Sequence, residues 1–205
     1  MSVRVIVMAN IEDKVIGYNG NSLLAEWWYW TDKIIEHQSM LKKTNDKHTS
    51  KKLNKLYRKR KLKFRHAVKT IVSRFVHICW LDGVSEIVIG DLKGIRDNNS
   101  KGKKINTMIH NFWSHNYLVK RIKEKAEEYN VNVKEINEAH TSSICPRCHS
   151  QHVLKRKRLF KCLDCGLEAH RDAVGCVTIG LTQGDPLPAG VINRVVARPL
   201  LLSLV

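Results

Sequence analysis

The sequence predicts a mixed α/β domain that carries a small metal-binding module. Strand-like and helix-like segments alternate along residues 1–140, which is the order expected of a mixed sheet with packed helices. Two C-x-x-C pairs after residue 140 predict the module. The chain has 205 residues, of which 43% are hydrophobic. It is therefore expected to fold as one domain with at most a small appendage.

The first half of the chain predicts a hairpin and two helices. β-Branched residues at 3–10 and 14–18 favour a β-hairpin. The cluster Trp27-Trp28-Tyr29-Trp30 begins a helical segment, and its rings can serve either core packing or base stacking. Apolar residues then recur at three- and four-residue spacing from Leu53 to Val76, which predicts a long helix over about 50–80.

A second strand–helix–strand series follows. Residues 85–92 read as a buried strand that runs into a polar loop at 93–104. Residues 108–126 predict a helix that is loosened near 114–116, and residues 131–136 predict another strand. The mixed sheet is therefore expected to contain strands from both halves of residues 1–140.

Positive charge is concentrated on the long helix. Lys and Arg number 36 against 19 acidic residues, which gives a formal net charge of +17, and residues 42–74 hold fourteen basic residues against Asp46. A solvated face is one reading, but like charges at helical spacing destabilise a helix unless something compensates them. We therefore predict a phosphate-binding face that contacts DNA or RNA, with these residues in contact: Lys55, Arg58, Lys59, Arg60 and Lys63.

Four cysteines predict a structural zinc site. Cys145 and Cys148 are separated by thirteen residues from Cys162 and Cys165, and two such pairs supply the four sulfur ligands of a closed tetrahedral site. Redox or merely buried thiols are the other readings. The hairpin between the pairs carries four basic residues that are expected to contact nucleic acid: Lys155, Arg156, Lys157 and Arg158. Cys79 and Cys176 are expected to be core residues.

The sequence shows neither a spanning apolar segment nor a signal peptide. A cytoplasmic, reducing location is expected, where six cysteines favour metal binding over disulfides. No membrane partner is expected.

The C-terminal motifs resemble one family. Thr141-Ser142, the two cysteine pairs with Gly166, and His170-Arg171-Asp172 occur in the order found in TnpB (OrfB-type) insertion-sequence proteins, which have long been described as transposases. The strand at 87–92 and the preceding basic helix also resemble that family, so the similarity covers roughly residues 15–182.

The resemblance implies an RNase H-like, RuvC-like nuclease with a zinc ribbon inserted before its last helix. Members cleave DNA under the direction of an RNA transcribed from the element, and they resemble type V CRISPR effectors. On that pattern, residues 1–140 are a partial nuclease domain, 141–168 the ribbon, 169–182 the last helix and 183–205 a tail. DNA and guide RNA are then the expected partners, with structural Zn²⁺ and, in a competent enzyme, Mg²⁺.

The family's three carboxylate positions are incompletely matched. Asp172 matches the third. Gly90 stands where a glutamate is usual, so Glu138, placed before the ribbon as in some TnpB and Fanzor proteins, is the proposed substitute, with Asp91 as a local alternative. The first position, an aspartate in a D-x-G strand, has only Glu12 or Asp13 nearby.

These departures lead to the expectation of an N-terminally truncated member that binds nucleic acid and cleaves weakly or not at all. The alternative is a non-catalytic zinc-ribbon protein that binds nucleic acid or docks on other proteins; the Thr141-Ser142 and His170-Arg171-Asp172 flanks argue against a bare docking ribbon. The tail, which contains Pro186, Pro188, Pro199 and the run Leu200-Leu201-Leu202, is expected to be a flexible end or out-of-frame sequence.

Overall fold

The structure is a computed structural model that describes residues 5–11, 13–45, 48–91, 106–108, 112, 114–137, 141–184 and 187–203. Three sequence predictions lie outside these residues: the loop at 93–104, Glu12 and Glu138. In chain order the elements are β1 (Val5–Ile11), β2 (Lys14–Asn19), α1 (Asn21–Asn45), α2 (Lys51–Leu81), β3 (Glu86–Asp91), α4 (His115–Glu127), β4 (Asn132–Asn137), the 3₁₀ turn η2 (Thr141–Ser143), β5 (Val153–Arg156), β6 (Leu159–Cys162), β7 (Glu168–His170), α5 (Arg171–Thr182), α6 (Ala189–Ala197) and β8 (Leu200–Leu202). The predicted mixed α/β architecture is confirmed.

The predicted N-terminal hairpin is present. β1 and β2 pair antiparallel, with Ile11 opposite Lys14 at the turn end, and β8 adds to β2 in parallel. β-Branched residues favour this pleated conformation because their side chains pack well on it. Tyr18 on β2 is 1% exposed, so the sheet contributes directly to the core.

A second sheet is formed by β3 and β4, which pair in parallel from Glu86 opposite Asn132 to Asp91 opposite Asn137. Parallel neighbours need a crossover connection, and α4 lies between the two strands in sequence and packs on α2. The sequence predicts a helix over 108–126 that is loosened near 114–116. In the structure α4 begins at His115, so a helix boundary lies in the predicted region.

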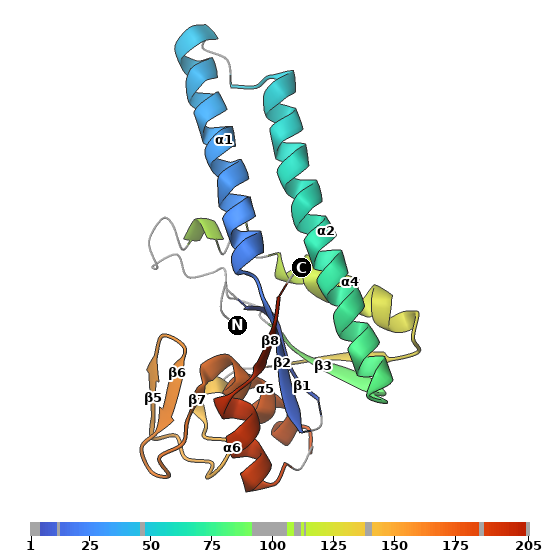
Figure 1. The fold of residues 1–205 in the computed structure, drawn as a ribbon, viewed down its shortest axis with the longest axis vertical. Helices are drawn as coiled ribbons and strands as arrows, with labels where there is room; N and C mark the ends of the chain where they lie inside the picture. Colours follow the sequence, from blue (N-terminus) through green and yellow to red (C-terminus); the bar gives the residue numbers. More distant parts are fainter. Residues whose placement is uncertain are drawn as a thin grey trace.

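Helices α1 and α2 form a long antiparallel pair that projects from the sheets (Figure 1). At 1.5 Å per residue, the 31 residues of α2 span about 46 Å. Ser50 caps this helix by accepting a hydrogen bond from the Leu53 N–H at 3.0 Å, and its hydroxyl also lies 3.2 Å from His37 Nε2 on α1. The cap and this contact fix the turn between the two helices.

The main core lies where the helix pair meets the sheets. Trp27 is 4% exposed, and its ring makes edge contacts with Trp28 and Phe112 at centroid distances of 5.0 and 5.6 Å. Core packing is thus the role of Trp27, whereas Tyr29 is 55% exposed. The same core takes in Phe75 of α2 and strand residues of both sheets.

A second core joins the cysteine-rich module to the first sheet. It is built around α5, whose Ala173, Val174 and Val177 are fully buried, and it includes Met8 of β1 and Phe160 of β6. The predicted core position of Cys79 is confirmed, since it is 2% exposed, whereas Cys176 is half-buried and its thiol donates to the Met8 carbonyl at 2.9 Å.

The C-terminal residues differ from the flexible end that was expected. Helix α6 buries Ile192, Val195 and Val196 in the second core, and β8 hydrogen-bonds to β2. Three prolines and a leucine run do not reveal this packing, because the partners of α6 and β8 lie far away in sequence. Among the helices described, none is long and apolar enough to cross a bilayer.

We expect Ile192→Ala to lower the free energy of unfolding by about 2 to 5 kcal/mol, because it removes a buried side chain from the second core. Leu200→Ala, at a side chain that is 57% exposed, is the matched control and should change stability by less than about 0.5 kcal/mol. Urea denaturation measures both. Equal stability of the Ile192 variant and the parent would show that the C-terminal residues are not part of the core.

Candidate metal centre and acidic cavity

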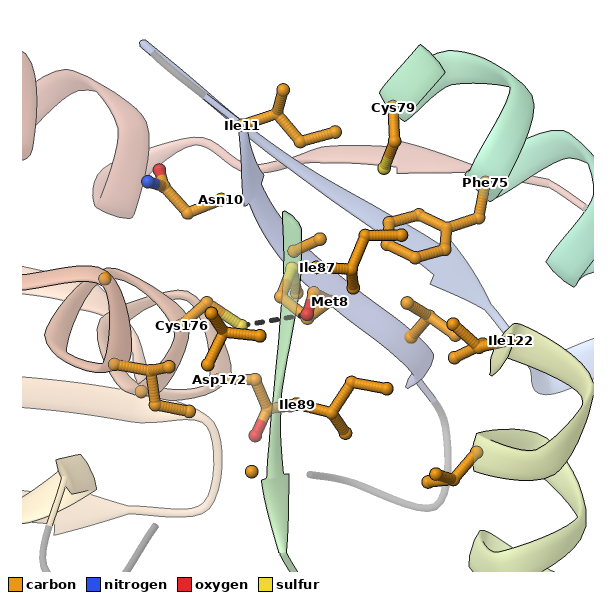
Figure 2. A pocket seen from close by; sticks show the side chains of 18 of the residues that line it. Met8, Asn10, Ile11, Phe75, Cys79, Ile87, Ile89, Ile122, Asp172 and Cys176 are labelled. Carbon is orange, nitrogen blue, oxygen red and sulfur yellow. Dashed lines mark hydrogen bonds between the residues drawn. The ribbon is translucent and has the colours of Figure 1, made fainter. Parts of the chain in front are cut away.

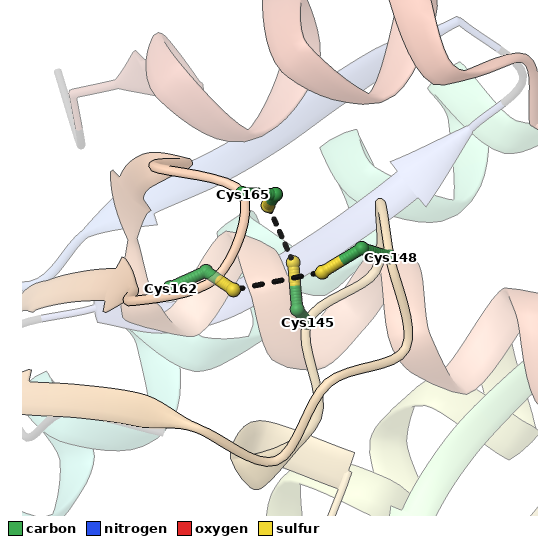
Figure 3. Close-up of side chains that lie close together, drawn as sticks. All are labelled: Cys145, Cys148, Cys162 and Cys165. Atoms are coloured by element: carbon green, nitrogen blue, oxygen red, sulfur yellow. Dashed lines mark hydrogen bonds between the residues drawn. The ribbon is translucent and has the colours of Figure 1, made fainter.

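The four predicted cysteines converge. Their sulfur atoms lie within 4.8 Å of one another, and the Cys145–Cys165 and Cys148–Cys162 sulfur pairs are both 3.6 Å apart (Figure 3). Cys145 and Cys148 lie in the loop before β5, whereas Cys162 ends β6 and Cys165 lies in the turn after it, so the hairpin brings the two pairs together.

The two loops repeat one backbone design. In the first, the Cys145 N–H donates to Ser150 and the Cys145 carbonyl accepts from the His149 N–H. In the second, the Cys162 N–H donates to Leu167 and the Cys162 carbonyl accepts from the Gly166 N–H. The residue after the second cysteine has a positive φ in both loops, 60° at His149 and 72° at Gly166. This turn points both thiols of each pair inward.

The arrangement fits a tetrahedral zinc ion. Four sulfurs at about 2.3 Å from one ion stand about 3.8 Å apart, close to the 3.6 Å pairs. Four protein ligands leave no open coordination position, so such an ion holds structure and does not activate a substrate. The cluster can therefore hold a metal such as zinc, with Cys145, Cys148, Cys162 and Cys165 as its ligands.

The thiols do not ionise equally without a cation. Burial raises the pKa of Cys145 to about 12, so its sulfur stays protonated at neutral pH. Burial also opposes ionisation of Cys165, but hydrogen bonds from the Leu167 N–H and the neighbouring thiols lower the pKa of Cys165 to about 6. Binding of a metal ion must therefore release protons from the cluster.

Asp172 lies on the lining of a cavity of about 540 Å³ between β1, β3 and the helices α2, α4 and α5 (Figure 2). It stands in the first turn of α5, where the positive end of the helix dipole favours a carboxylate. Its Oδ2 atom is buried and has no hydrogen-bond partner in the described part of the chain. The sequence prediction that Asp172 begins the last helix and faces the sheets agrees with this placement.

Two further polar groups line the same cavity and were not singled out from the sequence. Asn10 Oδ1 on β1 and His115 Nε2 on α4 are buried without partners among the described residues. Burial lowers the pKa of His115, as it does that of His170 before α5. No local pattern marks Asn10 or His115, because only the packing of β1 and α4 brings them to the cavity.

The described lining does not fit a pair of divalent ions. A two-metal site needs several converging carboxylates, and the lining supplies Asp172 and, at the beginning of β3, Glu86. Gly90, at the other end of β3, offers no ligand. Asp91 follows it on the same strand but is not among the residues lining the cavity.

The predicted basic residues of α2 divide into two groups. Lys55, Arg58, Lys59 and Lys63 line one shallow surface depression together with Leu62 and His66, and we call these six residues the basic face. Arg60 points elsewhere. It is half-buried, donates to Thr31 Oγ1 at 2.9 Å, and stacks over Trp27 at 5.0 Å.

The other predicted basic residues lie on the β5–β6 hairpin. Lys155 and Arg156 end β5 and are exposed; Lys157 takes a positive φ of 55° in the connecting turn, and Arg158 completes that turn. The carbonyl of Arg158 also accepts from the Arg171 N–H at 2.7 Å. The turn is thereby linked to the beginning of α5.

Two family models match the chain. One, described as a probable transposase (OrfB_IS605), matches residues 1–96, and the other, described as a Cas12f1-like TNB domain, matches residues 115–179.

Three curated relatives are similar to the chain. A TnpB-like protein of Aquifex aeolicus (strain VF5) is 29% identical over 60% of this chain and 40% of its own length. A TnpB-like protein of Acidianus two-tailed virus is 24% identical over 98% of this chain and 43% of its own length. The CRISPR-associated endodeoxyribonuclease Cas12f1 of Sulfoacidibacillus thermotolerans is 30% identical over 63% of this chain and 30% of its own length. The chain thus spans less than half of each relative.

Solved structures share the fold. The Cas12f1 chain in a complex with sgRNA and target DNA superimposes with a TM-score of 0.60 and 14% identity, over 87% of this chain and 50% of that one. A CRISPR-Cas12f ternary complex gives the same TM-score with 15% identity, over 85% of this chain and 38% of that one.

We expect Cys145→Ser to abolish stoichiometric zinc binding and to unfold the cysteine-rich module, because metal binding and folding of such modules are one event. Cys176→Ser, outside the cluster, is the matched control and should bind zinc as the parent does. Metal analysis by mass spectrometry, with circular dichroism for folding, measures both. Full zinc occupancy in the Cys145 variant would rule out the four-sulfur site.

Proposed function

The chain belongs to the TnpB family, and from this premise we propose that it binds nucleic acid while cleaving DNA weakly or not at all. The observation that carries the proposal is the basic face on α2. We further propose that the cysteine cluster holds zinc. We also propose that the sheets and α5 form an RNase H-like, RuvC-like fold. The parallel β3–β4 pair and the likeness to Cas12f1 structures support that fold assignment.

The basic face suits a phosphate backbone. Its residues recur at three- and four-residue spacing from Lys55 to His66, so they form one continuous stripe along α2. Lys55, Arg58 and Lys59 are exposed, and Leu62, which lies between Lys59 and Lys63 in the sequence, is 53% exposed. Clustered cations on a long helix attract phosphates and release their counterions.

Two side chains of α1, Trp30 and Glu26, border this stripe. The Lys59 ammonium lies 4.5 Å from the Trp30 ring centre, and Lys63 pairs with Glu26 at 3.3 Å. Lys55 and Arg58 are therefore the cations of the face with fewest competing contacts, and we assign them the phosphate contacts. We propose that Arg60 has a different role and holds α2 against α1 through its contacts with Thr31 and Trp27.

The β5–β6 hairpin is the second proposed contact. Lys155, Arg156, Lys157 and Arg158 surround its tip, which the metal cluster and the Arg158–Arg171 hydrogen bond hold in place. Contacts from a rigid tip position a protein on a nucleic acid without reading its sequence. Because related solved structures hold sgRNA and target DNA, we propose DNA and a guide RNA as the ligands.

The acidic site underlies the proposed weak or absent cleavage. Asp172 is the carboxylate offered by α5, and its buried, unpartnered oxygen suits a single Mg²⁺ ion, which binds through one or two carboxylates and waters. A bound ion would supply Lewis-acid stabilisation of the phosphate. Glu138 remains the predicted second ligand and lies outside the described residues.

We expect the double variant Lys55→Ala/Arg58→Ala to bind all nucleic-acid sequences more weakly and to about the same degree. The slope of log affinity against log salt concentration should fall by about 2, one for each phosphate contact removed. Fluorescence anisotropy with two unrelated oligonucleotides measures this.

Two controls accompany that experiment. Lys33→Ala/Lys120→Ala removes the same charge from α1 and α4 and should leave the slope nearly unchanged. Arg60→Ala should lower thermal stability, because Arg60 of α2 contacts Thr31 and Trp27 of α1. An unchanged slope in the Lys55/Arg58 variant, or loss for one sequence alone, would refute phosphate binding by this face.

We expect the purified zinc-loaded chain to leave labelled single-stranded and duplex DNA almost uncut in Mg²⁺, because the described cavity lacks the carboxylates of a two-metal site. Any residual cutting should disappear in Asp172→Asn and persist in Asp32→Asn, an exposed position on α1. Gel analysis of the products measures both. Rapid Mg²⁺-dependent cleavage would overturn the proposal of weak activity, and cleavage that survives Asp172→Asn would remove Asp172 from the site.

A further inference from the structure

Four consecutive aromatic residues of α1 divide between the core and the surface. Trp27 is buried in the main core, and Trp28 packs against that core. Tyr29 is 55% exposed, and Trp30 is half-buried beside it. The Tyr29 and Trp30 rings meet edge to face, with their centroids 5.1 Å apart. Core packing thus accounts for the first two rings, whereas the last two, which we call the outer ring pair, belong to neither core.

The outer ring pair adjoins the basic face. Helices α1 and α2 lie side by side (Figure 1), and the Lys59 ammonium stands 4.5 Å from the Trp30 ring centre. Lys55 is one helical turn from Lys59, about 6 Å along α2. Cations and exposed aromatic surface therefore lie next to each other on the helix pair, within the span of a few nucleotides.

Glu26 determines how charge is distributed over this surface. Its carboxylate pairs with Lys63 at 3.3 Å and accepts a hydrogen bond from the Trp30 ring N–H at 3.5 Å. A negative charge at this position repels a phosphate group but not an uncharged base. Phosphates are therefore favoured at Lys55 and Arg58, and a base is favoured at the outer ring pair.

Unpaired nucleotides suit this combination of groups better than a duplex does. In a duplex the faces of the bases are stacked inside the helix, so an exposed protein ring gains no stacking contact. In a single strand each base has a free face, and its stacking on an aromatic side chain stabilises binding whatever the sequence. Proteins that hold single strands combine cations for the backbone with rings for the bases.

We propose that the basic face and the outer ring pair form one site for the unpaired nucleotides of a single strand. Lys55 and Arg58 contact its phosphates, and one base stacks on the Tyr29 ring. Trp30, with Lys59 over its own ring, supports Tyr29 from the side. The inference rests on nucleic-acid binding by the basic face, which is proposed above, and it adds the class of ligand, a single strand in preference to a duplex.

Binding of three matched ligands tests the proposal on the full, zinc-loaded chain. They are a single-stranded DNA of about 12 nucleotides, the same strand with abasic sites that keep its phosphates, and the duplex of the same sequence. We expect Tyr29→Leu to weaken binding of the single strand about fivefold or more, the effect of losing one base–aromatic stack, and to change binding of the other two ligands less than about twofold. Fluorescence anisotropy at one salt concentration measures all three affinities.

Two further variants serve as controls. Tyr29→Phe keeps the ring and should bind the single strand as the parent does. Trp80→Leu removes a ring that is 49% exposed and about 30 Å from Lys59 along α2, and it should leave binding unchanged. The salt slope should be the same in Tyr29→Leu and the parent, because the ring carries no charge. Circular dichroism checks that each variant is folded.

Three results would overturn the proposal. Parent-like binding of the single strand by Tyr29→Leu, or an equal loss with Trp80→Leu, would rule out stacking on Tyr29, and salt-dependent binding by the parent would then leave the proposed function standing. The same loss for all three ligands would show that Tyr29 shapes the face and does not contact a base. Affinity of the parent that does not change with salt would refute phosphate binding itself, and this inference with it.

Discussion

The convergence of four cysteine sulfurs is the constraint on which the rest of the C-terminal half depends. The two repeated turns at Cys145 and Cys162 pull the ends of the β5–β6 hairpin together. Leu167 and Phe160 then become buried next to α5, and the Arg158 carbonyl receives the first N–H of that helix. A hairpin of two four-residue strands has too little apolar area to hold this geometry alone, so a metal ion held by the four sulfurs would also fix where α5 begins.

The position of α5 links the metal centre to the sheets. Helix α5 begins next to the cysteine-rich module and buries Val174 and Val177. Its Cys176 thiol donates a hydrogen bond to the Met8 carbonyl of β1. Asp172 consequently lies over the gap between β1 and β3 and not over a closed sheet. The same helix supports α6, and through the C-terminal strand β8 the last residues return to β2.

Features with local causes could be predicted from the sequence, whereas those that depend on distant partners could not. The hairpin, the long helix α2 and the cysteine cluster follow from periodicity, turn residues and ligand spacing within a few dozen residues. The interpretation of the C-terminal residues as a flexible end was wrong, because Ile192 and Val196 find their partners in α5 and the ribbon. Even within the correctly predicted helix α2, the sequence does not show which basic side chains are exposed. Arg60 has the same charge as Arg58 but lies against Thr31 and Trp27 of α1. The cavity, and the buried Asn10 and His115 atoms that have no partner among the described residues, arise only from the way the two sheets and α4 pack together.

Charge and fold together support the proposal that the chain binds a polyanion. A net charge of +17 on 205 residues disfavours the compact state through self-repulsion, and the exposed stripe on α2 is where phosphates would relieve it. The most direct measurement is the affinity of the zinc-loaded chain for one oligonucleotide between about 50 and 200 mM salt. The account predicts a straight decline of log affinity with log salt concentration, with a slope that corresponds to several phosphate contacts. Affinity that does not change with salt would contradict it.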